Sequence, residues 1–216
     1  MKLRILIPLL FIFSTVLSQT EKLTKTTYKD TSQIDKLSAR ISYYGINTFH
    51  AGLKIGVEYP IKRKIIEKPR IPRKYGLKVI HKEWIASINL TGYYHKNNHT
   101  GFWLNPELSR RRTGRRGGFK EFSYGIGFLK TFQPKTYIVN DDGSVDKVFM
   151  PGHGFFTISL GIAYGKDYSV KKNKPLCWYI KPNYYLIFPY NTLFNMGFGF
   201  EVGITYKFLS NPFLKK

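Results

Sequence analysis

The stretch from Phe194 to Phe208 limits what this chain can fold into more than any other part of it. Every second residue is large and apolar, and the residues between are glycine, asparagine, glutamate, threonine and lysine. Strict period-two alternation places the two sets on opposite faces of a β-strand. At about 3.3 Å per residue the stretch is about 50 Å long. Tilted by about 40°, it crosses the ~25 Å apolar band of an outer membrane.

The chemistry of the two faces indicates the kind of barrel. A soluble barrel hides its apolar face inside, whereas a membrane barrel turns that face to lipid and keeps its lumen polar. Here one face is continuous and aromatic, and the other is small, polar or charged. The pattern therefore favours a membrane barrel and leaves a soluble, lipocalin-like barrel with a greasy interior as an alternative.

The same alternation recurs along the chain and predicts the number of strands. Seven strands are clear, and the run Ala39 to Ile46 makes eight; single-chain bacterial barrels have even numbers of strands. Asp142-Gly143, between β-rich arms, predicts a hairpin that prolongs two barrel strands. The predicted fold is an all-β, eight-stranded, antiparallel up-and-down transmembrane β-barrel over residues 38–209.

The two ends of the chain lie outside this predicted barrel. Lys2 and Arg4, an apolar run to Phe13 and a small residue at Ser18 are typical of a cleaved secretory signal peptide over residues 1–18. Residues 19–37 are polar and predict a flexible lead-in, and residues 210–216 form a C-terminal tail. The predicted location is the outer membrane.

Charge and aromatic content set this chain apart from an average soluble domain. The formal net charge is +22 and aromatic residues make up 17%. Much of the charge lies in two basic segments. Residues 62–82 fit either a twisted hairpin beyond the membrane or a solvated loop, and residues 110–118 are predicted to form a glycine-rich turn. The single cysteine, Cys177, excludes an intramolecular disulfide framework.

Charged residues on the polar faces of the strands are predicted to point into the lumen. An eight-stranded barrel is just wide enough for side chains to fill it, and buried charges have to be paired. Mixed signs therefore favour a structural plug over a proton or ion path. The lumen set is Lys54, Glu58, Glu107, Glu121, Lys181, Glu201 and Lys207.

The basic segments are candidates for binding anions. Arginine makes bidentate contacts with phosphate, so lipid phosphates or anionic lipopolysaccharide or polysaccharide are the expected partners, and a purely solubilising loop is the alternative. The signal peptide argues against nucleic acid. The candidate residues are Arg110, Arg111, Arg112, Arg115 and Arg116.

Catalytic and metal-binding patterns are weak. His95 and His99 flank one turn, but two ligands do not make a metal site. A lipid-modifying enzyme would need histidine, serine and an acid together at the membrane face, and His153, Ser159 and Glu201 cannot be brought together from sequence. We therefore expect no enzyme, no metal and no cofactor, with a membrane-embedded lipid-modifying enzyme as the alternative.

The end of the last strand carries a motif. Glu201, Gly203, Tyr206 and Phe208 read polar, glycine, aromatic, aromatic, which resembles the C-terminal signal that the barrel-assembly machinery recognises, although eight more residues follow here. With the alternation and the signal peptide, residues 39–208 resemble the small OmpA/OmpX-like outer-membrane barrels, and in particular the uncharacterised Bacteroidota-type outer membrane beta-barrel group. The resemblance implies outer-membrane lipid and the assembly machinery as partners. It implies a structural or binding role, and it leaves the ligand and the oligomeric state open.

Overall fold

The computed structural model describes residues 26–29, 37–46, 50–69, 77–95, 99–133, 137–148, 151–172, 174–190 and 193–208. The predicted signal peptide and the predicted C-terminal tail lie outside the described residues. Within the described part of the chain, no helix is long and apolar enough to cross a membrane.

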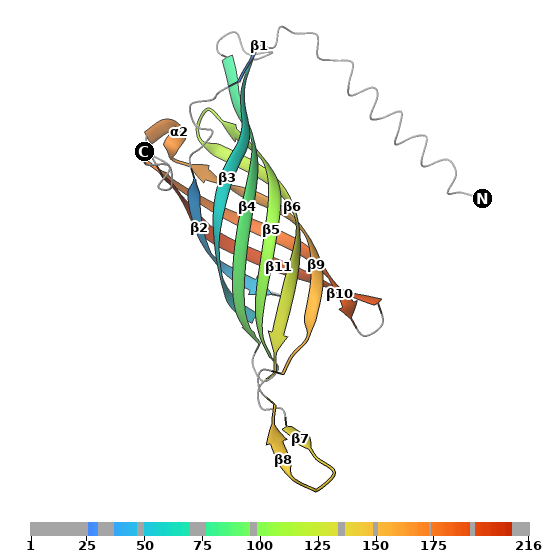
Figure 1. Ribbon diagram of the computed structural model, residues 1–216. Helices are drawn as coiled ribbons and strands as arrows, with labels where there is room; N and C mark the ends of the chain where they lie inside the picture. Colours follow the sequence, from blue (N-terminus) through green and yellow to red (C-terminus); the bar gives the residue numbers. More distant parts are fainter. Residues whose placement is uncertain are drawn as a thin grey trace, which may run out of the picture.

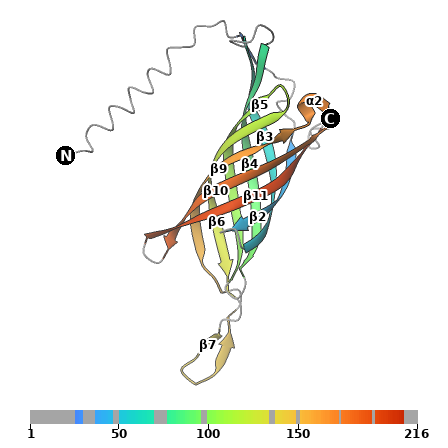
Figure 2. The ribbon, with the colours of Figure 1, turned by 180° about the vertical axis from the view of Figure 1, so that it is seen from behind.

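Eight of the described strands form one closed antiparallel ring. Each strand of the ring pairs with the next ring strand along the chain, including β3 with β4. The last strand, β11, pairs with the first, β2, and closes the ring (Figures 1 and 2). This confirms the predicted eight-stranded up-and-down barrel. The ring strands are β2 (Ser38–Ile46), β3 (His50–Pro69), β4 (Leu77–His95), β5 (His99–Gly114), β6 (Gly118–Phe132), β9 (Gly154–Asp167), β10 (Leu176–Tyr190) and β11 (Leu193–Lys207).

The alternation in sequence becomes an alternation in burial, with the apolar side chains outside. Along β5 buried and exposed residues alternate almost without interruption. Ile126 on β6 is 68% exposed and Ile88 on β4 is 64% exposed, whereas Asn89 and Glu201 are fully buried. The lipocalin-like alternative required a greasy interior, and it is wrong because the aliphatic and aromatic rows cover the outer wall.

The basic segment 62–82 extends the barrel wall past the ring. β3 and β4 stay paired from Lys62↔Trp84 to Pro69↔Leu77, so the structure has the hairpin and not the solvated loop. The strand β1 (Thr26–Lys29) pairs with β3 at residues 64–67. This part of the predicted flexible lead-in is therefore a strand, because it completes the free edge that β3 presents beyond β2.

Two further predictions about connections need correction. The turn predicted over residues 110–118 is shorter, because β5 continues to Gly114 and leaves only residues 115–117 between the strands. Gly117 closes that turn at a positive φ of 83°, where an added Cβ would meet the Asp167 carbonyl oxygen. The Asp142-Gly143 hairpin is present, but β7 (Tyr137–Val139) and β8 (Val145–Lys147) form a separate two-stranded sheet and do not prolong barrel strands (Figure 1).

Candidate functional site

The barrel has two unlike ends, and they are named here for their landmarks. The α2 end is where β2 begins, β11 ends and the short helix α2 (Ser169–Lys172) lies; the hairpin end carries β7 and β8 (Figure 1). Between them the lumen is filled by two layers of ion pairs and one layer of aromatic side chains.

The first ionic layer lies toward the α2 end and contains two arginines and two glutamates. Arg111 Nε donates to Glu121 at 2.6 Å, and Arg111 also lies 3.2 Å from a carboxylate oxygen of Glu58. Arg40 pairs with Glu58 and, at 3.4 Å, with Glu121. These four residues come from β2, β3, β5 and β6, so their contacts tie together strands across the lumen.

The second ionic layer contains two lysines and two glutamates. Lys54 lies 2.9 Å from Glu107 and 3.1 Å from Glu201, and Lys181 lies 2.6 Å from Glu107. The Ser42 hydroxyl donates to Glu201 at 2.9 Å. The carboxylates are thus held by several donors each, which is the condition for tolerating buried charge.

The two layers together carry no net charge. Four bases, Arg40, Lys54, Arg111 and Lys181, face four acids, Glu58, Glu107, Glu121 and Glu201, and all eight are buried. Two further pairs, Lys207–Asp167 and Arg63–Glu83, lie nearer the α2 end. The excess positive charge of the chain is therefore not in these two layers of the described lumen.

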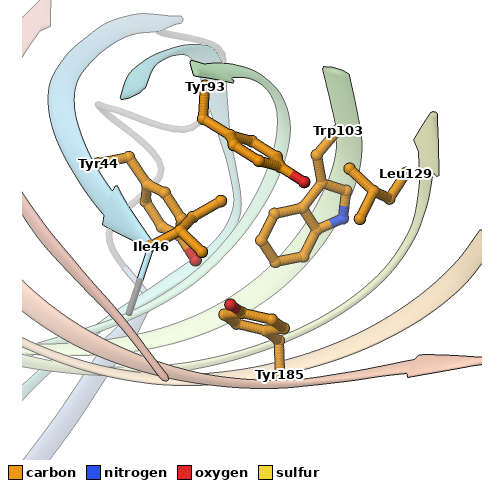
Figure 3. Close-up of a cluster of buried hydrophobic side chains, with 6 residues drawn as sticks. All are labelled: Tyr44, Ile46, Tyr93, Trp103, Leu129 and Tyr185. Carbon is orange, nitrogen blue, oxygen red and sulfur yellow. The ribbon is translucent and has the colours of Figure 1, made fainter. Parts of the chain in front are cut away.

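An aromatic layer lies above the ion pairs, toward the hairpin end. Its six members come from five strands, with two of them on β2, and they converge across the lumen (Figure 3). Trp103 meets Tyr44 and Tyr185 edge-on, with ring centroids 6.0 and 5.5 Å apart, and its indole N–H donates to the Thr157 hydroxyl at 2.7 Å. The layer consists of Tyr44, Ile46, Tyr93, Trp103, Leu129 and Tyr185.

Exposed cations gather at the α2 end, on and beside the outer wall. Several stand opposite outward aromatic rings: Arg110 lies 5.8 Å from the Trp84 ring and Lys120 lies 5.2 Å from the Tyr164 ring. Aromatic girdles of this kind mark the membrane interface in barrels. The exposed cations described at this end are Lys62, Lys64, Lys78, Arg110, Arg112, Arg115, Arg116, Lys120, Lys166 and Lys174.

The structure separates the predicted anion-binding arginines into two groups. Arg110, Arg112, Arg115 and Arg116 are exposed. The prediction that Arg111 binds an external anion is wrong. Its side chain points into the lumen and pairs with Glu58 and Glu121, so an external anion cannot reach it.

The predicted lumen residues lie inside the barrel. Lys54, Glu58, Glu107, Glu121, Lys181 and Glu201 are buried, and Lys207 is half-buried at the α2 end beside Asp167. Sequence reasoning missed Arg40 as a lumen charge. The alternation along β2 contained the signal. Ile41 and Tyr43 face outward, so Arg40, which lies one residue before Ile41, has to face the lumen.

The residues of the predicted assembly signal at the end of β11 do not all lie on the same face of the barrel wall. Glu201 belongs to the second ionic layer, and Gly203 lets β11 pass Ser42, whose Cβ would lie 2.4 Å from an added Cβ. Tyr206 is exposed on the outer wall, with its ring centroid 5.5 Å from that of Phe208.

The described residues offer no metal site. No three histidine, cysteine, aspartate or glutamate side chains among them are arranged to hold a metal. Ser159 bonds to Asn105, Glu201 bonds to Ser42 and Tyr179, and His153 contacts Thr131 through its backbone. The three residues considered for a lipid-modifying enzyme thus have separate partners in the structure.

Comparisons with known proteins found likeness only among solved structures. No family model and no curated protein matches the sequence. The chain is similar to the N-terminal β-barrel domain of Pseudomonas aeruginosa OprF, with 10% identity, a TM-score of 0.42 and coverage of 81% of this chain and 98% of that one. It is also similar to Neisserial surface protein A, with 13% identity, a TM-score of 0.39 and coverage of 86% and 99%. Likeness this distant carries no argument about function, which has to come from the chain's own residues.

Proposed function

We propose that this chain is a non-enzymatic outer-membrane barrel that does structural or binding work, and that its basic α2 end binds anionic envelope components. The observation that carries the proposal is the separation of charge. The lumen layers are neutral, while ten exposed Lys and Arg residues described at the α2 end surround the barrel.

The outer wall supports the membrane assignment. Its exposed aliphatic and aromatic residues would form one large apolar patch on a soluble protein, far beyond what monomers expose in water. The closed ring of strands also supports it, since in lipid every backbone polar group has to be satisfied within the closed barrel. Export through the signal peptide, insertion by the barrel-assembly machinery and kinship with the OmpX-like, Bacteroidota-type barrels belong to the same proposal.

The position of the cations supports phosphate as the chemistry recognised. Arg110 and Arg112 project outward next to the aromatic girdle, at the level where lipid headgroups lie, whereas Arg115 and Arg116 occupy the turn beyond it. Guanidinium groups pair with phosphate in bidentate fashion. Lipid phosphates would meet the first pair, and a phosphorylated or acidic polysaccharide would meet the second.

The test compares two charge-neutralised pairs. The full chain is refolded into vesicles, and its affinity for phosphatidylglycerol over phosphatidylcholine and for lipopolysaccharide-derived anionic polysaccharide is measured at low salt. Each arginine near the surface contributes about 1 kcal/mol, so Arg110→Gln with Arg112→Gln should weaken anionic-lipid binding about 30-fold. Arg115→Gln with Arg116→Gln should act mainly on the polysaccharide.

A matched pair at the other end is the control. Lys130→Gln with Lys147→Gln removes two positive charges near the hairpin end and should leave both affinities within about twofold. Equal losses from the control pair and the arginine pairs would contradict a binding surface at the α2 end, because the net charge alone would then account for the attraction.

A further inference from the structure

The hairpin end of the lumen opens into a pocket that the proposed function does not use. It has a volume of about 560 Å³, within the range of small-molecule sites. Its apolar wall includes Ile46, Leu129 and Phe155, and Tyr93 and Tyr185 of the aromatic layer also line it (Figure 3). Four histidines, His50, His95, His99 and His153, stand around it.

The pocket is closed on the side that faces the aromatic layer and the α2 end. Next to it, the aromatic layer encloses only a cavity of about 20 Å³ lined by Trp103, Thr157 and their neighbours, about enough for one water. The two ionic layers follow. A molecule that enters the pocket from this end therefore binds there and does not pass through.

The described residues that line the pocket carry no fixed charge. None of them is aspartate, glutamate, lysine or arginine. The titratable groups that face the pocket are His50 from β3, Tyr93 and His95 from β4, His99 from β5, His153 next to β9, and Tyr185 and Tyr190 from β10.

Three of these histidines, His50, His95 and His99, are crowded together at the mouth of the pocket. The His50 and His95 rings stack with centroids 3.6 Å apart, His95 and His99 are 5.3 Å apart, and the Tyr93 hydroxyl lies 3.1 Å from His99 Nε2.

We propose that this pocket binds an aromatic carboxylate and binds it more tightly as the pH falls. The aromatic ring packs on the tyrosine and phenylalanine side chains of the wall, and the carboxylate accepts hydrogen bonds from the histidines at the mouth. No aspartate or glutamate is among the described residues that line the pocket, so the anion supplies a counter-charge for a protonated imidazole in this cluster.

The direction of the pH effect follows from linkage. A bound carboxylate raises the pKa of the imidazole it meets, so binding takes up a proton and the affinity rises as the pH falls through the histidine range. The gain ends near pH 4, where the carboxylate itself becomes protonated. A change from pH 7.5 to 5.5 should tighten binding about 10-fold.

The test uses 1-naphthoate and the full chain in zwitterionic nanodiscs, with calorimetric titration at pH 7.5 and 5.5 and empty nanodiscs as the partition blank. The uncharged analogue 1-naphthalenemethanol should bind with the same affinity at both pH values. The variant His50→Asn, His95→Asn and His99→Asn should lose the pH dependence, and the single variant His95→Asn should reduce it. Heat-modifiable gel mobility confirms that each variant is folded.

A histidine at the opposite end provides the matched control. His81 on β4 is half-buried beside Arg63 at the α2 end, and His81→Asn should behave as the wild type. The proposal is overturned if wild-type affinity for 1-naphthoate is the same at both pH values, if only the blank accounts for binding, or if His81→Asn and the triple variant give the same result.

Discussion

The two halves of the lumen are filled by different chemistry. Toward the α2 end, four acids and four bases form a balanced set in which each charge depends on a partner from another strand. Toward the hairpin end, tyrosine and tryptophan rings meet edge-on and leave a pocket above them. The charged half must be complete to be stable, whereas the aromatic half can hold space for a ligand. The same barrel wall therefore surrounds a filled lumen at one level and a ligand-sized pocket at the next.

Removing a shared carboxylate should be the most damaging single change in the lumen. Glu107 accepts from Lys54 at 2.9 Å, Lys181 at 2.6 Å and Asn105 at 2.9 Å. Glu107→Ala leaves buried cations without this partner and should lower the free energy of unfolding by about 3–5 kcal/mol. Urea unfolding of the vesicle-inserted barrel, followed by tryptophan fluorescence, measures the change.

Glu67 supplies the control for this prediction, since it is a glutamate on the β3 extension, outside the lumen layers. Glu67→Ala should change the free energy of unfolding by no more than about 0.5 kcal/mol. A loss below about 1 kcal/mol for Glu107→Ala would show that the charged half is hydrated and does not depend on its pairs.

Filling space in the aromatic half should cost less. An alanine Cβ at position 197 would lie 2.2 Å from the Tyr185 ring, so Gly197→Ala has to displace that ring, at about 1–3 kcal/mol. Gly118→Ala is the control, since nothing lies within 4 Å of its added Cβ. The same unfolding measurement applies, and equal values for the two glycines would remove the argument for tight packing around Tyr185.

The smallest effect should come from a single hydrogen bond in the aromatic layer. Trp103→Phe keeps an aromatic ring between Tyr44 and Tyr185 but removes the 2.7 Å bond to Thr157, at about 1 kcal/mol. Trp178→Phe on the exposed outer wall should change stability by less than about 0.5 kcal/mol. If Trp178→Phe lowered the free energy of unfolding more than Trp103→Phe, the contacts of the outer wall would contribute more to stability than this hydrogen bond in the lumen.

Much of the barrel could be predicted from parity alone. Period-two alternation placed the apolar rows and the inward glutamates, because each strand has one face toward lipid and one toward the lumen. It predicted seven clear strands, and the even number expected of such barrels added the run Ala39 to Ile46 as the eighth. Arg111 was misplaced because three consecutive arginines look like a solvated turn; extending the parity of Leu104 and Leu108 would have put it inside.

Other features had no signal in the sequence. Which acid pairs with which base depends on the stagger between strands, so the contact of Lys54 with Glu107, 53 residues apart, could not be read from either strand. The pairing of β1 with β3 also escaped prediction, since residues 26–29 show polar, lead-in composition and are ordered by the free edge of the β3 extension.

The central claim, that the apolar rows contact hydrocarbon, is tested most directly by quenching from brominated acyl chains. In a background in which Trp84, Trp103 and Trp178 are replaced by phenylalanine, Ile126→Trp places one indole at a position that is 68% exposed on the outer wall. Brominated lipid should quench this indole strongly, and it should leave a variant that retains only Trp103 nearly unquenched. An indole at position 126 that is untouched by brominated lipid and quenched by aqueous iodide would contradict the membrane assignment.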